Sequence, residues 1–97
     1  MSTPYTELRL RSQQAAEQFR LCHDIEASLA LVGIVETMAA LCVHLTALEQ
    51  QRFAQLLKAI LACQERQDWL GLADYLAWEW ADLLLSIDAR LAETAEK

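Results

Sequence analysis

Residues 46–68, TALEQQRFAQLLKAILACQERQD, decide the fold of this chain. The stretch opens on Thr46 and carries Glu49 three positions later, which is the spacing of a capping box at the start of a helix. Apolar side chains then recur three or four residues apart, with glutamine and charged residues between them, as on an amphipathic helix. Only Gln67 and Asp68 precede the next apolar run, and Asp68 is itself a good helix cap. Such a short connection predicts two antiparallel neighbouring helices.

Composition extends this helical pattern to the whole chain of 97 residues, which is 55% hydrophobic and holds two glycines and one proline. Turn-rich β architectures need far more of both residues, so the composition predicts an all-α fold. The length suits one domain with a modest core, which oligomerisation would enlarge. We therefore predict a single domain over 1–97, a four-helix up-down antiparallel bundle that forms a homodimer. The expected helices span residues 5–21, 25–45, 47–67 and 69–94.

The number of helices depends on the junction between His23 and Asp24. Pro4 suits the first turn of a helix, and Asp24 is a plausible cap for a second one. On one continuous helix, the apolar faces before and after His23 would be out of phase by roughly a quarter turn. No glycine or proline marks the break, however, so a three-helix alternative with one long helix over 5–45 stays open.

The segment 27–45 is apolar over nearly the length of a membrane span. Glu36 lies in its middle, and an acid at the centre of a bilayer costs about 2.5–3.5 kcal/mol on insertion scales. Basic flanking residues are also missing. We therefore expect no membrane insertion and predict that this is the most buried helix of a soluble bundle.

Charge and cysteine content exclude several classes of function. The net charge is −6, and from Asp68 onward seven acidic residues stand against two basic ones, so a nucleic acid is not an expected partner. The three cysteines, at positions 22, 42 and 63, form neither a disulfide framework nor a zinc-binding pair. We read them as reduced, mostly buried thiols of a cytoplasmic protein.

No catalytic constellation emerges from the polar residues. Glu36 and His44 lie eight residues apart, too far to chelate one ion, and the Glu-x-x-His spacing of di-iron bundles is absent. A Gly-x-Ser-x-Gly motif and a glycine-rich phosphate loop are absent as well. We expect no catalytic, cofactor-binding or metal-binding residue, no cofactor and no enzymatic activity.

The last predicted helix carries one group of residues that its core face does not explain. Its broad apolar face accommodates Trp69 and Trp80 as core fillers. On the opposite side, three large side chains lie among acidic ones, a grouping typical of protein contacts. The predicted partner-binding residues are Tyr75, Trp78, Leu85, Asp74 and Asp82. In the alternative interpretation, another helix of the same bundle covers them.

The segment 68–84, DWLGLADYLAWEWADLL, resembles the C-terminal helix of small bacterial helical proteins of unassigned function. Their pattern is an Asp-aromatic start followed by Leu-Ala-Asp-x-Leu-x-x-Glu. The matching positions are Asp68, Trp69, Leu72, Ala73, Asp74, Leu76 and Glu79. Such proteins are similar in size, charge and fold to bacterial flagellar export chaperones, an analogy that assigns no functional residue here.

Together these observations predict a non-catalytic protein–protein interaction module. It would be an adaptor or an export-chaperone-like protein that binds a helical segment of a partner. A purely structural homo-oligomer is the alternative. A ligand-binding or enzymatic bundle comes third, because it would need polar groups inside the core.

Overall fold

The computed structural model describes residues 3–95, with the side chains of residues 3–93. Within that range the structure is helical and contains no strand, which confirms the all-α prediction. The elements are α1 (Pro4–Arg20), α2 (Asp24–Leu41), the 3₁₀ turn η1 (Cys42–His44), α3 (Ala47–Glu65), α4 (Trp69–Asp74), the π-helical segment η2 (Tyr75–Trp80) and α5 (Ala81–Ala95).

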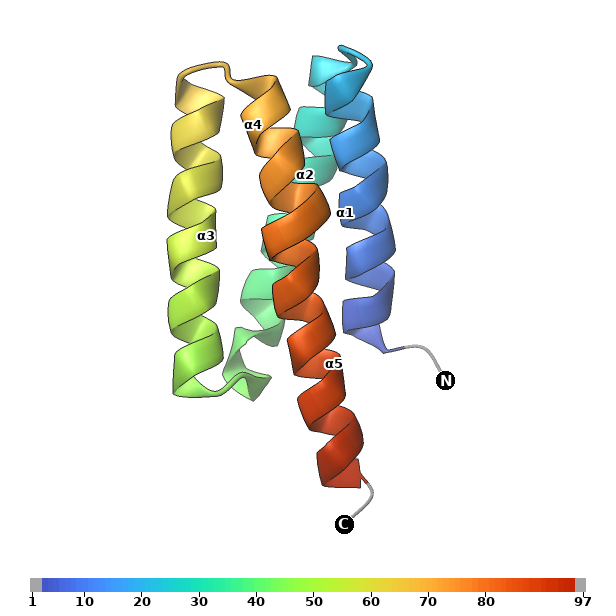
Figure 1. Cartoon of the computed structure of the whole chain (residues 1–97), viewed down its shortest axis with the longest axis vertical. Coiled ribbons are helices and arrows are strands. Elements are labelled where there is room, and N and C mark those ends of the chain that lie inside the picture. Colours follow the sequence, from blue (N-terminus) through green and yellow to red (C-terminus); the bar gives the residue numbers. More distant parts are fainter. Residues whose placement is uncertain (1–2, 96–97) are drawn as a thin grey trace.

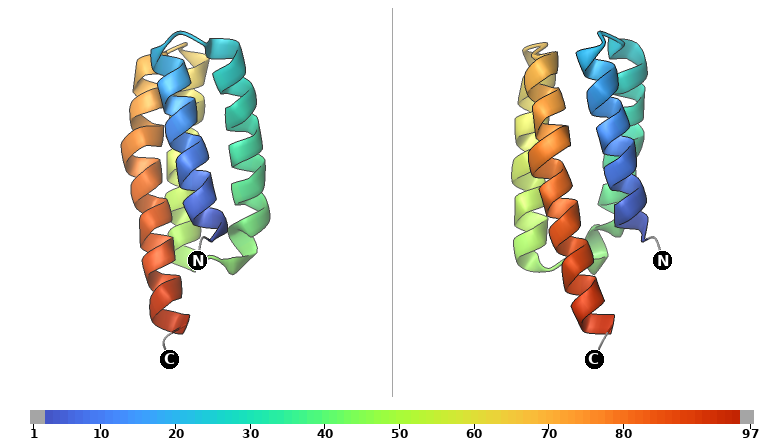
Figure 2. Two further views of the ribbon diagram at one scale, coloured as in Figure 1. Left: turned by 90° about the vertical axis from the view of Figure 1, so that its right-hand side faces the viewer. Right: turned by 45° about the vertical axis from the view of Figure 1, so that its right-hand side comes forward.

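The helices lie side by side, and successive ones run in opposite directions (Figure 1). α4, η2 and α5 follow one another without a break and form a single rod, which we call the C-terminal rod. α1 packs closely against both α2 and this rod, and α3 packs against the rod. α2 and α3 are not among the closely packed pairs of the described residues, so the seam between them is open. In the left view of Figure 2, α1 lies between the C-terminal rod and α2.

The junction after α1 is a true break, so the alternative of one helix over 5–45 is wrong. Cys22 has a φ of 63°, in the left-handed region. The His23 amide donates to the Gln18 carbonyl at 2.9 Å and the Cys22 amide to the Phe19 carbonyl at 3.2 Å, as in a Schellman motif. The expected cap is also wrong, because Asp24 is the first helical residue and its N-cap, His23, makes no side-chain cap bond.

The start of α3 follows the sequence prediction. The Glu49 amide donates to the Thr46 hydroxyl at 3.1 Å, and the Thr46 amide donates to the Glu49 carboxylate at 2.9 Å, so the capping box is complete. Asp68 caps α4 by accepting a hydrogen bond from the Gly71 amide at 3.0 Å. Between them α3 ends in a second Schellman motif with Gln67 at a φ of 56°.

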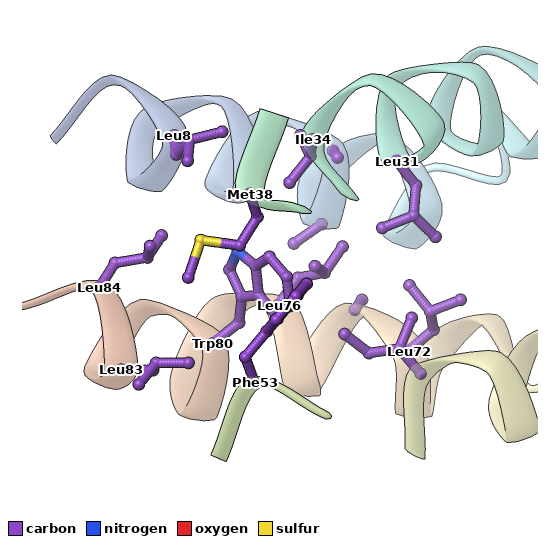
Figure 3. Packing of buried hydrophobic residues seen from close by; sticks show 14 of the residues in the cluster. Leu8, Leu31, Ile34, Met38, Phe53, Leu72, Leu76, Trp80, Leu83 and Leu84 are labelled. Atoms are coloured by element: carbon purple, nitrogen blue, oxygen red, sulfur yellow. The ribbon is translucent and has the colours of Figure 1, made fainter. Parts of the chain in front are cut away.

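The core is centred on Trp80 of the C-terminal rod, whose side chain is fully buried (Figure 3). Its indole lies between Met38 of α2 and Phe53 of α3, and it meets the Phe53 ring edge-on with 5.6 Å between centroids. Toward the other end, Phe19 of α1 stacks on Trp69 at 5.5 Å. Aromatic pairs in these geometries add to the free energy gained by burial. Residues from each of α1, α2, α3 and the C-terminal rod therefore meet in one core.

The prediction that the second helix is the most buried one is wrong. In α2 only Ala27, Leu31, Ile34 and Met38 are buried. Only 22% of the most apolar window within Asp24–His44 is buried inside the structure. A helix that is apolar around its circumference needs neighbours on several sides, and the closely packed neighbour of α2 is α1 alone among the other long helices. Much of its apolar surface therefore faces outward.

Candidate partner-binding surfaces

Trp78 and Leu85 lie on the outer side of the C-terminal rod, away from the core. Trp78 is 70% exposed and Leu85 is 45% exposed, so the alternative in which another helix of the chain covers them is wrong. We call these two residues, with Asp74 and Asp82, the Trp78 face. Large aromatic side chains of this kind dominate the energetics of protein interfaces.

Tyr75 lies apart from the Trp78 face, although the sequence placed it there. It is half-buried and packs against the core. Its side chain lines a groove of about 360 Å³ between α3 and the C-terminal rod, together with Arg52, Leu56 and Asp82. Both residues belong to η2, but the Tyr75 phenol lies toward α3 while the Trp78 indole faces solvent.

The two acids of the Trp78 face are paired with arginines of neighbouring helices. Asp74 is 3.1 Å from Arg20 of α1, and Asp82 is 3.7 Å from Arg52 of α3. Their side chains are 68% and 77% exposed. Because they are exposed, both carboxylates remain accessible to a partner, and pairs of this kind add little to stability.

Leu70 is a further exposed apolar residue of the rod that the sequence analysis did not single out. It is 65% exposed and lies in the first turn of α4. Leu70 precedes Trp78 by eight residues, slightly more than two helical turns. Its position outside the apolar core face of the last predicted helix was the signal that could have identified it.

The polar residues considered for chemistry do not converge. Glu36 and His44 are both exposed. Glu36 borders a hollow whose other lining residues are leucine, isoleucine, valine and a single glutamine. Within residues 3–95, no three histidine, cysteine or acidic side chains lie close enough together to hold a metal ion.

The cysteines differ from the predicted buried thiols. Cys63 is buried and Cys42 is half-buried, but Cys22 is exposed in the turn after α1. All three are free thiols. The exposure of Cys22 follows from the break at this junction, which turns the residue out of a helical face.

A partly buried ion pair links the start of α3 to α5. Arg90 donates a 2.8 Å hydrogen bond to Glu49, which is only 9% exposed. Burial by itself raises the pKa of Glu49, but hydrogen bonds from Arg90 and Thr46 outweigh it, so this pKa lies below its ordinary value of 4.5. Burial also raises the pKa of the nearby Tyr5 phenol. The position of Glu49 has a structural explanation, because this residue completes the capping box of α3 and joins α3 to α5 through Arg90.

Comparisons with protein-family models, with curated proteins and with solved structures find no match to this chain. The resemblance of residues 68–84 to bacterial helical proteins therefore stays a prediction. By length and composition alone, the segment Asp24–His44 could cross a membrane.

Proposed function

We propose that this chain is a non-catalytic protein-interaction module of the bacterial cytoplasm, a four-helix up-down bundle that binds a helical segment of a partner. The exposure of Trp78 carries the proposal. Two residues along the same rod, Trp80 is fully buried, so the fold has the capacity to bury an indole and leaves this one in water. Exposure on this scale leaves roughly 150 Å² of aromatic surface for a partner to cover.

The surroundings of Trp78 suit recognition of an amphipathic helix. The groove between α3 and the C-terminal rod runs beside the Trp78 face and has Tyr75 in its wall. Arg52 and Asp82 border this groove and supply charges of both signs for orienting a partner. A helix laid along the groove would place its apolar residues on Tyr75 and Trp78, in the helix-in-groove mode.

The ligand-binding or enzymatic alternative has less support. It needs convergent polar groups in an enclosed site, and the hollow beside Glu36 is apolar and open to solvent. An adaptor or export-chaperone-like role is consistent with the Trp78 face, which offers a contact surface and no reacting group.

Affinity capture from the native bacterial cell tests the proposal with a matched pair of variants. Trp78→Ala removes the exposed indole, while Leu48→Ala removes an equally exposed apolar residue, 67% accessible, at the start of α3. We expect Trp78→Ala to reduce captured partner by at least about tenfold, the loss typical of an interface hot spot. Leu48→Ala should retain it. Equal capture by both variants would rule out the Trp78 face as the binding site.

A further inference from the structure

The outward side of α2 carries a line of large aliphatic side chains. Ile25, Leu29 and Val32 are 77%, 70% and 52% exposed. They are spaced by four and then three residues, and the same spacing continues through Glu36 and Ala39 to the exposed Val43. A four–three repeat of apolar residues is the pattern by which two helices pack their side chains together. We call Ile25, Leu29 and Val32, with Leu61 across the seam, the α2 face.

The α2 face is hollowed as well as apolar. Two adjoining hollows run along the open seam between α2 and α3, and Val32 lines both of them. One, of about 220 Å³, is bounded on the far side by Leu57, Ile60 and Leu61. The other lies at the start of α2 and reaches Trp69. The α2 face therefore combines protruding side chains with hollows that can receive them, as a self-complementary surface requires.

The size of the α2 face matches that of a small homodimer interface. Its four exposed side chains leave roughly 400 Å² of apolar surface in water, as much as the largest apolar patch on a typical monomer. Homodimer interfaces are about 65% apolar. A 400 Å² apolar patch therefore corresponds to roughly 600 Å² buried per protomer, at the lower end of stable dimers.

The side of the molecule formed by α2 carries less of the net negative charge than the C-terminal rod does. Most of the net charge of −6 belongs to residues 68–97, and in the left view of Figure 2 α1 separates the C-terminal rod from α2. The hollows of the α2 face are bordered by the acids Asp24 and Glu36, and Arg11 of α1, which reaches Thr37 at 3.5 Å, supplies a positive charge next to α2. Two copies can therefore approach through their α2 faces while their acidic sides point apart.

From these features we infer that a second copy of this chain docks on the α2 face, with the two α2 helices packed across a two-fold axis. The Trp78 face stays free on the outside of such a dimer. The inference does not depend on the proposed partner-binding role of Trp78, because it rests on different residues on the other side of the molecule.

Sedimentation equilibrium of the purified full chain tests the inference. We expect the wild type to approach twice its chain mass of 11.0 kDa at micromolar concentration. Leu29→Glu should halve the observed mass, because it places a charge in the centre of the interface. Leu48→Glu introduces the same charge at a similarly exposed site outside the α2 face, and Trp78→Ala alters the opposite face. Both controls should remain dimeric, with helical circular dichroism unchanged.

A milder variant guards against loss of folding. Ile25→Ser should weaken the dimer by about tenfold, the loss expected on truncating a buried interface residue, and it leaves the protomer core untouched. A wild type that stays monomeric overturns the inference, and so does a Leu29→Glu variant that stays dimeric. A monomer that binds neutral lipid vesicles through Leu29 would also overturn it, by assigning the α2 face to a membrane.

Discussion

Replacing Trp80 with alanine should destabilise the protein severely, while the same replacement at Trp78 should barely affect it. Trp80 is fully buried and contacts Phe53 and Met38 in the centre of the core. Truncating a buried tryptophan costs about 3–5 kcal/mol, from lost burial and from the cavity left behind. A chain of 97 residues has about 5–15 kcal/mol of stability in total. Trp80→Ala therefore removes a large part of it.

Trp78 is the matched control, because it lies two residues away in the same π-helical segment and is 70% exposed. The change in helix propensity is the same for both variants, so their difference isolates burial. We expect Trp78→Ala to change the free energy of unfolding by no more than about 0.5 kcal/mol. Urea titrations followed by far-UV circular dichroism give the comparison, at one protein concentration because the inferred dimer would make stability depend on concentration.

With a urea m-value of about 1.5 kcal/mol/M for a chain of this size, the unfolding midpoint of Trp80→Ala should fall by about 2–3 M. Trp80→Phe adds a second check, since the buried indole nitrogen of Trp80 has no hydrogen-bond partner. Phenylalanine keeps an aromatic ring and removes the unpaired donor, so this variant should lose less than about 1.5 kcal/mol. Similar midpoints for Trp78→Ala and Trp80→Ala would refute the assignment of one indole to the core and the other to the surface.

Further variants test the local structure by the same urea titrations. Glu49→Gln should be less stable than wild type at pH 7. The difference should shrink as pH falls below 4.5, because the lowered pKa of this carboxyl stabilises the fold only while it is ionised; a difference that does not change with pH would contradict this. Gly33→Ala should raise the free energy of unfolding by about 0.5–1 kcal/mol, since its new methyl meets only the end of a flexible arginine. Gly71→Ala should lower it by about 1 kcal/mol, because the methyl displaces the aspartate that caps α4. Changes of the same sign in the two variants would contradict this reasoning. Gln67→Gly should stabilise by about 1 kcal/mol, because it relieves a left-handed φ, and a loss of stability would count against it.

Local signals predicted the helices well because they act over three or four residues. The capping box of Thr46 and Glu49, the Asp68 cap and the proline at the start of α1 all do in the structure what their spacing indicates. The break at Cys22 was harder to place, because a cysteine occupies the left-handed position that glycine usually fills. Its signal was the change of phase between two apolar faces, which identified the junction although no breaker residue marks it.

Burial was predicted less well, because it depends on how the helices sit relative to one another. The apolar circumference of α2 indicated neighbours on several sides, and the sequence cannot say whether those neighbours belong to the same chain. Ile25 and Leu29 lie at the surface, although the helix that carries them was expected to be the most buried one. Tyr75 was misplaced for a related reason, since a helical wheel gives its direction but not the position of α3, which partly covers it.

The two apolar faces follow from one limit of the fold. A chain of 97 residues that is 55% hydrophobic cannot bury all its apolar side chains in a small bundle. Part of the surplus forms two faces, with aliphatic residues in a four–three repeat on α2 and Trp78 with Leu85 among acids on the C-terminal rod. An extended aliphatic line suits a permanent helix pairing, whereas an isolated indole with charges around it suits a partner that binds and leaves. Substitutions in the α2 face should therefore weaken the dependence of the free energy of unfolding on protein concentration. Substitutions at Trp78 should change partner binding alone.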